Sequence, residues 1–222
     1  MATKTKKLKI DEKHEITLIS YTAGTKPHGR FVLAHGAGAD QNHRFMVLFG
    51  EGLAARGVET TTFNFVYTEN KKRAPDKPPL LEATYRAVVE SVGAPVFIGG
   101  KSMGGRIASQ IAASGTNVLG LIFLGYPLHP PGKPEQLRVA HWPKITAPIL
   151  FVQGEKDAFG SPDEILAQTK TLRAKFQMYP VAGGDHSLGV GKKALAAAGL
   201  TQEKIYTNAM DAIAAFIFKN AK

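Results

Sequence analysis

The sequence predicts an α/β fold built on a mostly parallel, doubly wound sheet, with an antiparallel hairpin at the N-terminal end of the chain. Two observations predict it. Short apolar runs alternate with segments whose apolar residues recur at helical spacing, which is typical of parallel strands covered by helices on both faces. The chain has 222 residues, of which 44% are apolar, so it can bury one substantial core. We therefore expect a single domain spanning residues 1–222.

The first third of the chain begins with the hairpin and then changes to strand and helix. Two alternating runs flank a polar turn, and two further apolar runs follow them. Between the last two runs, apolar residues at helical spacing predict a helix that ends before Gly57. The strands expected here are residues 7–10, 15–21, 30–35 and 59–65.

The remainder keeps the same alternation. Helices are expected over residues 80–91, directly after Ser102, and from the capping box that Ser161 and Glu164 form around Pro162. The last helix has an apolar face made of Ile205, Ala209, Ile213, Phe216 and Ile217. The strands expected here are residues 95–99, 118–125, 148–154 and 175–181. Ligands of such sheets bind beyond the carboxyl ends of the strands, so functional residues are expected just after a strand.

The amino-acid composition excludes several kinds of functional site. The chain has no cysteine, which excludes disulfides, thiolate metal sites and a cysteine nucleophile. Its formal net charge is +10, but the clearest basic clusters, within residues 4–9 and 71–77, are not interleaved with aromatic residues. We interpret them as solvated surface rather than a nucleic-acid site. Neither a metal nor an organic cofactor is expected.

The N-terminal segment of the sequence, residues 1–7, does not have the pattern of a targeting signal. It is basic but leads into no uninterrupted apolar stretch, and no apolar run in the sequence reaches membrane-spanning length. We therefore expect a cytoplasmic protein without a membrane partner. The expected state is a monomer or a weak homodimer.

The best candidate for a nucleophile is Ser102, in the pattern G-x-S-x-G formed with Gly100 and Gly104. The pattern lies between an apolar strand and a helix, where a serine takes a strained backbone conformation and its neighbours must lack bulk. The alternative of an incidental serine in a glycine-rich turn does not explain this context. A phosphate loop is excluded because Pro95 stands where its first glycine would be.

A serine nucleophile needs a base, and a neutral imidazole needs a carboxylate that fixes its tautomer. His186 is the one histidine downstream of Ser102 that follows the last expected strand, so it is the candidate base. Asp157 follows the strand at residues 148–154 and is the candidate acid. Glu155 is its rival, whereas Asp185 is adjacent to His186 in the chain, where the two side chains rarely meet correctly.

Two backbone amides are expected to stabilise a developing oxyanion. The first is the amide of Met103, at the N-terminus of the helix after the serine. The second belongs to the loop after residues 30–35, with Ala37 preferred and Gly38 as the alternative. In that loop His35 is expected to stabilise the backbone and Asp40 to accept a local hydrogen bond.

Lys101 precedes the candidate nucleophile directly. Adjacent side chains diverge at such a turn, so we expect Lys101 to point away from the cleft and to support the local structure rather than to act as a base.

With these residues assembled, the chain resembles the α/β-hydrolases of the dienelactone-hydrolase-like group. It is most similar to the branch of small proteins that includes the testis-expressed hydrolase-like proteins and the hydrolase-like subunit of a chromatin acetylation complex. The marks are residues 35–38, 99–106, 125–128, 153–157, 160–162 and 184–187. The resemblance implies the α/β-hydrolase fold and a triad of Ser102, Asp157 and His186. Dienelactone hydrolase proper uses a cysteine nucleophile, so lactone specificity does not carry over.

The expected function is that of a serine hydrolase that cleaves a carboxylic ester, thioester or amide through an acyl-serine intermediate, with a small-molecule acyl compound as its substrate. The alternative is a non-catalytic scaffold or binding protein that retains the fold. Residues 126–147 are too few for a large lid. Within them, Tyr126, Leu128 and His129 are expected at the mouth of the substrate site, and Trp142 either joins them or packs under a loop.

Overall fold

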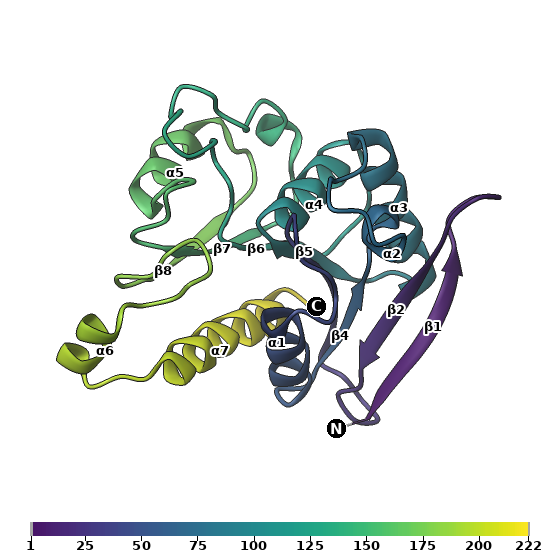
Figure 1. Cartoon of the computed structure of the whole chain (residues 1–222), viewed down its shortest axis with the longest axis horizontal. Coiled ribbons are helices and arrows are strands. Elements are labelled where there is room, and N and C mark those ends of the chain that lie inside the picture. Colours follow the sequence, from purple (N-terminus) through teal and green to yellow (C-terminus); the bar gives the residue numbers. More distant parts are fainter. Residues whose placement is uncertain (1, 222) are drawn as a thin grey trace.

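A computed structural model of the chain describes residues 2–221 and has one eight-stranded sheet at its centre (Figure 1). The strand order is β1-β2-β4-β3-β5-β6-β7-β8. The strands are β1 (Thr3–Lys9), β2 (Glu15–Tyr21), β3 (Gly29–Ala34), β4 (Val58–Phe63), β5 (Phe97–Lys101), β6 (Gly120–Leu124), β7 (Ile149–Gly154) and β8 (Phe176–Val181).

The sheet is mostly parallel, as the alternation of apolar runs predicts. β1 and β2 form an antiparallel hairpin, and β2 joins the rest by antiparallel pairing with β4. From β4 to β8 every neighbouring pair is parallel. The predicted fold class is therefore confirmed. β1 begins at Thr3, earlier than the sequence suggests, because its lysine-rich first half pairs with β2 although it buries nothing.

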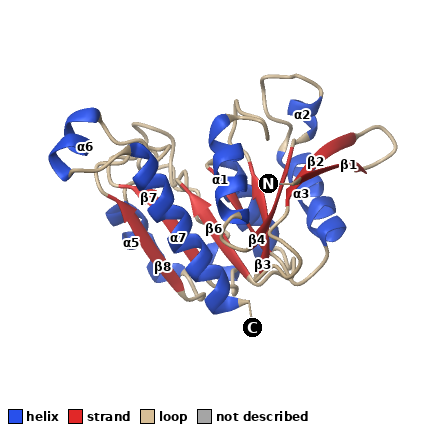
Figure 2. Cartoon of the chain, turned by 90° about the horizontal axis from the view of Figure 1, so that it is seen from below, coloured by secondary structure: helices blue, strands red, loops and turns tan. Residues whose placement is uncertain are grey.

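Helices cover both faces of the sheet (Figures 1 and 2). Apolar side chains of α1 and α7 pack on one face, and those of α3, α4 and α5 pack on the other. The helices are α1 (Arg44–Ala54), α2 (Val66–Glu69), α3 (Pro78–Val92), α4 (Met103–Ala113), α5 (Pro162–Gln168), α6 (Lys192–Ala198) and α7 (Gln202–Asn220). The two apolar layers fix the sheet between them, and burial of this surface is the main stabilising term of the fold.

Two helices were not predicted, and each lacks the signal that would reveal it. α2 has four residues, too few for helical periodicity to appear. α6 has seven residues, none of them buried, and its run of alanines around Leu195 gives no contrast between an apolar and a polar face. By contrast, the capping box at Ser161 is present, with the side chains of Ser161 and Glu164 each bonded to the backbone of the other.

The segment between β6 and β7 carries no large lid. Within residues 125–148 the regular structure consists of the 3₁₀ turn η1 (Trp142–Lys144). As for membrane insertion, none of the helices described over residues 2–221 has the length and apolar character needed to cross a bilayer.

Candidate active site

The carboxyl ends of four strands meet at one edge of the sheet, and each is followed by residues of the candidate site. β3 leads into the loop at residues 35–40, and β5 ends directly before Ser102. β7 leads to Asp157 and β8 to His186. Because parallel strands point the same way, these loops converge although they are far apart in the sequence.

Ser102 sits in a strained turn between β5 and α4. Its backbone angles are φ 50° and ψ −115°, a region that residues with a side chain rarely adopt. Its glycine neighbours allow the turn to pack against β3: a Cβ atom at Gly100 would lie 2.3 Å from the carbonyl oxygen of Ala34, and one at Gly104 would lie 2.5 Å from the same oxygen. The strain presents the Ser102 hydroxyl at the surface of a cavity.

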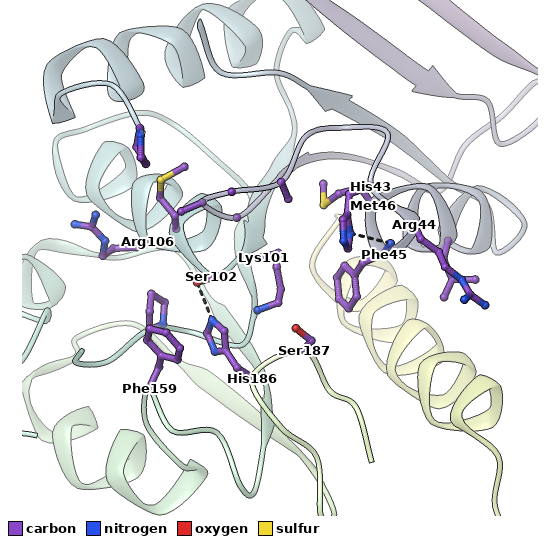
Figure 3. A pocket seen from close by; sticks show the side chains of 18 of the residues that line it. His43, Arg44, Phe45, Met46, Lys101, Ser102, Arg106, Phe159, His186 and Ser187 are labelled. Carbon is purple, nitrogen blue, oxygen red and sulfur yellow. Dashed lines mark hydrogen bonds between the residues drawn. The ribbon is translucent and has the colours of Figure 1, made fainter. Parts of the chain in front are cut away.

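The structure brings Ser102, His186 and Asp157 into a continuous hydrogen-bonded chain. His186 Nε2 lies 2.8 Å from Ser102 Oγ (Figure 3). On the other side of the ring, Nδ1 lies 2.9 and 2.8 Å from the two carboxylate oxygens of Asp157. Phe159 stacks on the imidazole, with ring centroids 4.1 Å apart. The ring is therefore held in one plane, with one nitrogen directed at the hydroxyl.

The side chain of Asp157 is fully buried and its oxygens are satisfied. Besides His186, they accept a hydrogen bond from Gln153 Nε2 at 2.8 Å and one from the backbone N–H of Phe159 at 2.8 Å. These donors orient the carboxylate toward the imidazole and compensate for its loss of water.

The rival carboxylates lie elsewhere. Glu155 accepts the backbone N–H of Gly183 at 2.9 Å. Asp185 accepts the amides of Ser187 and Gly189 at 2.7 and 2.8 Å. Both therefore shape the loop that carries His186, and the contact to the imidazole Nδ1 is made by Asp157.

The candidate oxyanion donors lie beside Ser102. Ala37, Gly38 and Met103 all line the same cavity as the serine. Met103 is the first residue of α4, so its N–H has no acceptor within the helix. A Cβ atom on Gly36 would lie 3.4 Å from Ser102 Cβ, which shows how closely the loop after β3 approaches the turn.

His35 anchors that loop, as expected. Its fully buried ring donates from Nδ1 to the carbonyl oxygen of Gly36 at 2.8 Å. Its Nε2 accepts from the Phe65 amide at 3.3 Å and from the Thr68 hydroxyl at 3.0 Å. Burial lowers the pKa of His35 to about 4, so the ring is neutral at pH 7. Asp40 accepts the amide of Asn42 at 2.9 Å, which is the local bond that the sequence predicts.

The cavity in front of Ser102 has a volume of about 1190 Å³. On one side of Ser102 lies Arg106, and on the other lie Phe45 and Met46 at the start of α1 (Figure 3). Tyr206 of α7 lies against Phe45, with ring centroids 5.9 Å apart, and also lines the cavity. One side of the cavity is therefore basic, and the opposite side combines these apolar side chains with the polar side chains of His43 and Arg44.

The structure does not place the expected mouth residues in the cavity. Tyr126, Leu128 and His129 are buried, and none of them is among the residues that line the cavity. The Tyr126 hydroxyl donates to the carbonyl oxygen of Arg138 at 2.9 Å and accepts from Trp142 Nε1 at 3.1 Å. These side chains turn inward because they form the core beneath the β6–β7 segment, and Trp142 packs with them.

Lys101 also differs from its expected placement. Its side chain lines the cavity instead of pointing away from it, and Figure 3 shows it extending past Ser102 toward the side of His186. Burial lowers its pKa to about 8, although the charges of Asp157 and Asp185 oppose that shift. The rule that adjacent side chains diverge fails because the cavity reaches around both sides of the turn.

Sequence reasoning missed several residues of the cavity. Arg106 had a usable signal, since it lies four residues after Ser102 and begins on the same face of the helix. Phe159, Arg138, Phe45 and Tyr206 had none, because each reaches the cavity from a loop or helix whose docking only the tertiary structure determines.

Comparison with known proteins agrees with this architecture. The family model of the alpha/beta hydrolase domain matches residues 27–218. Among solved structures, an alpha-beta serine hydrolase homologue from Coxiella burnetii is similar at a TM-score of 0.72 and 15% identity, covering 99% of this chain and 98% of that one. Est1E from Butyrivibrio proteoclasticus, solved with ferulic acid bound, is similar at a TM-score of 0.76 and 16% identity, covering 97% and 98%.

Dienelactone hydrolase from Anabaena variabilis is similar at a TM-score of 0.69 and 15% identity, covering 93% of this chain and 95% of that one. At such identities the likeness is one of fold. The family model, by contrast, covers most of the sequence, including all four loops that converge at the carboxyl edge of the sheet. The chain belongs to the alpha/beta hydrolase domain family.

Proposed function

We propose that this chain is a serine hydrolase that cleaves a carboxylic ester, thioester or amide through an acyl-Ser102 intermediate. One observation carries the proposal: the hydroxyl of a strained serine lies 2.8 Å from an imidazole nitrogen whose ring is bonded on its other side to a buried carboxylate. A strained backbone persists only where the surrounding structure enforces it, and here it places the hydroxyl against a base.

The acylation half-reaction follows from this geometry. Ser102 Oγ attacks the carbonyl carbon and its proton passes to His186 Nε2. Asp157 stabilises the resulting imidazolium through Nδ1–H. The carbonyl oxygen becomes an oxyanion that accepts hydrogen bonds from the amides of Met103 and Ala37. When the carbon–heteroatom bond breaks, His186 gives its proton to the leaving alcohol, thiol or amine, and the acyl group stays on Ser102.

The second half-reaction uses the same groups. A water molecule loses a proton to His186 Nε2 and attacks the acyl carbon, and the oxyanion forms again at the same amides. Collapse of this intermediate returns the proton to Ser102 Oγ and releases the carboxylic acid. The groups that carry these steps all belong to the chain, so we propose that the reaction needs neither a metal nor an organic cofactor.

We also place the chain within the dienelactone-hydrolase-like group, close to the branch of testis-expressed hydrolase-like proteins and the hydrolase-like subunit of a chromatin acetylation complex. The motif at residues 99–106 and the loops at residues 153–157 and 184–187 support this placement. The substrate is then a small acyl compound, and Ser102 in place of a cysteine separates its chemistry from that of dienelactone hydrolase proper.

The test is covalent labelling with a fluorophosphonate probe, followed by hydrolysis of a panel of p-nitrophenyl esters of different acyl length. Wild-type protein should be labelled once, at Ser102. Ser102→Ala should abolish labelling and reduce kcat by more than about 100-fold. His186→Ala should do nearly the same, because the hydroxyl loses its base.

Ser91→Ala is the matched control, since Ser91 lies on α3 and bonds to Lys6 on the surface of the fold; it should be labelled like wild type. If folded wild-type protein is not labelled and hydrolyses none of the esters, the hydrolase proposal is wrong and the non-catalytic scaffold takes its place.

A further inference from the structure

Two arginines stand on the same wall of the cavity as the candidate nucleophile. Arg106 extends from the first turn of α4, and Arg138 extends from the segment between β6 and β7; both line the cavity that contains Ser102. Figure 3 shows Arg106 on the side of Ser102 opposite to Phe45. The chain thus presents two guanidinium groups on one side of the cavity, while the opposite side combines apolar Phe45 and Met46 with His43 and Arg44.

Hydrogen bonds hold the backbone of Arg138 on both sides. Its N–H donates to the carbonyl oxygen of Leu128 at 2.8 Å, and its carbonyl oxygen accepts from the Tyr126 hydroxyl at 2.9 Å. That hydroxyl is in turn bonded to Trp142 Nε1. The buried tyrosine and tryptophan therefore hold this residue of an otherwise irregular segment in one place. Precise mounting is what a binding residue needs.

The two guanidinium groups are not neutralised by the protein. Over residues 2–221, no ion pair within 4.0 Å involves Arg106 or Arg138. Two carboxylates also line the cavity, but neither is paired with these arginines: Asp76 accepts the Tyr67 amide at 2.8 Å, and Glu203 lies in the first turn of α7.

The electrostatic consequence appears at Arg138, whose pKa is lowered first by burial and then by the positive charge of Arg106. The charge of Arg106 also adds to burial in lowering the pKa of His141, so this wall is a site where positive charges repel one another. Like charges near each other destabilise a partly desolvated site, and a bound anion would relieve that repulsion.

We propose that Arg106 and Arg138 bind an anionic group of the ester or thioester that Ser102 cleaves, either a carboxylate or a phosphate. Guanidinium groups match the geometry of both anions and form charge-assisted hydrogen bonds with them. The apolar side chains of Phe45 and Met46, across the cavity from Arg106, contact the part of the substrate on the other side of the scissile carbonyl. This inference rests on the proposed hydrolase function and adds the class of its substrate.

The anion could belong to the acyl group or to the leaving group, and two pairs of matched esters separate these cases. Mono-p-nitrophenyl adipate is compared with p-nitrophenyl hexanoate, which has the same acyl length without the carboxylate. The hexanoate ester of 4-hydroxybenzoate is compared with the same ester of methyl 4-hydroxybenzoate. Preference for the anionic member of either pair supports the proposal and identifies the side; no preference in both pairs overturns it.

Variants then assign the preference to these residues. In Arg106→Gln and in Arg138→Gln, the ratio of kcat/KM for the preferred anionic ester to that for its neutral partner should fall by about 10 to 100-fold, mainly through KM. Arg106→Lys keeps the charge and should retain part of the ratio. Arg173→Gln makes the same charge change at an exposed arginine that does not line the cavity, and should keep the ratio.

A second readout does not depend on turnover. Free adipate should slow labelling of Ser102 by the fluorophosphonate, and this protection should weaken in Arg106→Gln and at high salt, which screens the charges. If Ser102 is labelled and neutral esters are cleaved, but the ratio in both arginine variants equals that of Arg173→Gln, the anion site is wrong and the hydrolase proposal stands. If neither labelling nor cleavage occurs, the hydrolase proposal itself fails.

Discussion

Lys101 shows how much one residue's surroundings matter. It follows an apolar strand and directly precedes Ser102, and its side chain lies in the cavity with most of its surface buried. Over residues 2–221 it forms no ion pair within 4.0 Å, so its ammonium group has given up water without a close counterion. The loss of water lowers the pKa of Lys101 to about 8. Because the group is still charged at neutral pH, its desolvation destabilises the folded protein there.

Lys101→Met should therefore raise the free energy of unfolding at pH 7, by roughly 1 to 3 kcal/mol. The methionine keeps the apolar stem and removes the desolvated charge. The gain over wild type should shrink as the pH rises from about 8 to 10.5, because the folded wild-type lysine then loses its proton while the unfolded one still holds it. Urea unfolding at several pH values measures both effects.

Lys101→Arg, which remains charged throughout this range, is the comparison. The difference in the free energy of unfolding between Lys101→Met and Lys101→Arg should stay constant from about pH 8 to 10.5. A methionine variant less stable than wild type at pH 7 would contradict the prediction, since it would mean that the fields of Asp157 and Asp185 outweigh the desolvation of the ammonium group.

Among the elements, the contact of α4 with β3 decides whether the turn at Ser102 can exist. α4 crosses so close to the end of β3 that no side chain fits at Gly104: a Cβ atom there would lie 2.5 Å from the carbonyl oxygen of Ala34 and 2.7 Å from that of His35. Both atoms belong to the backbone, so neither can rotate out of the way. The same approach sets the Met103 amide opposite the loop that carries Ala37.

Gly104→Ala should therefore destabilise the protein by about 2 to 4 kcal/mol, because α4 must move away from β3. The helix-forming advantage of alanine, about 1 kcal/mol, offsets only part of this. Thermal and urea unfolding measure the loss, and slower fluorophosphonate labelling should accompany it because the Met103 amide moves with the helix.

Gly191→Ala is the matched control: no atom lies within 4 Å of the added Cβ atom, and Gly191 precedes α6 with ordinary backbone angles. Its stability should stay within about 0.5 kcal/mol of wild type. Equal losses in the two variants would show that backbone contact with β3 is not the cause.

For the molecule as a whole, buried histidines link stability to pH. His35 and His141 both have a pKa of about 4, lowered by burial first, and at His141 also by the charge of Arg106. Each stays neutral in the folded protein over a range where the unfolded chain is already protonated. The resulting stability is complete above a pH of about 6.5 and is lost as the pH falls toward 4.

We expect the free energy of unfolding to decrease between pH 6.5 and 4.5, with roughly 2 to 3 kcal/mol of that decrease due to His35. Urea unfolding at pH 7.5, 6.5, 5.5 and 4.5 checks it. In His35→Gln, which keeps an amide donor and acceptor but does not titrate, the decrease should be smaller by this amount. An identical pH dependence in both proteins would show that other groups cause the acid sensitivity.

The sequence by itself determined the order of the elements and the outline of the site. The alternation of apolar runs predicted the parallel sheet, because the period of apolar residues reports directly which faces of an element are buried. The G-x-S-x-G turn identified Ser102 because the strained turn restricts which residues can surround it. His186 and Asp157 followed because the carboxyl ends of parallel strands must lie at one edge, and the structure brings both to Ser102.

Only the tertiary structure decided which side chains face the cavity. Tyr126 and Lys101 both point the opposite way from the direction expected: the tyrosine turns into the core, and the lysine lies in the cavity beside His186. Arg138 becomes a partner of Arg106 through a segment that has no periodic pattern. The direction of a side chain in a loop depends on how segments distant in the chain dock against one another, and that information is held in packing between elements rather than in the local pattern of any one of them.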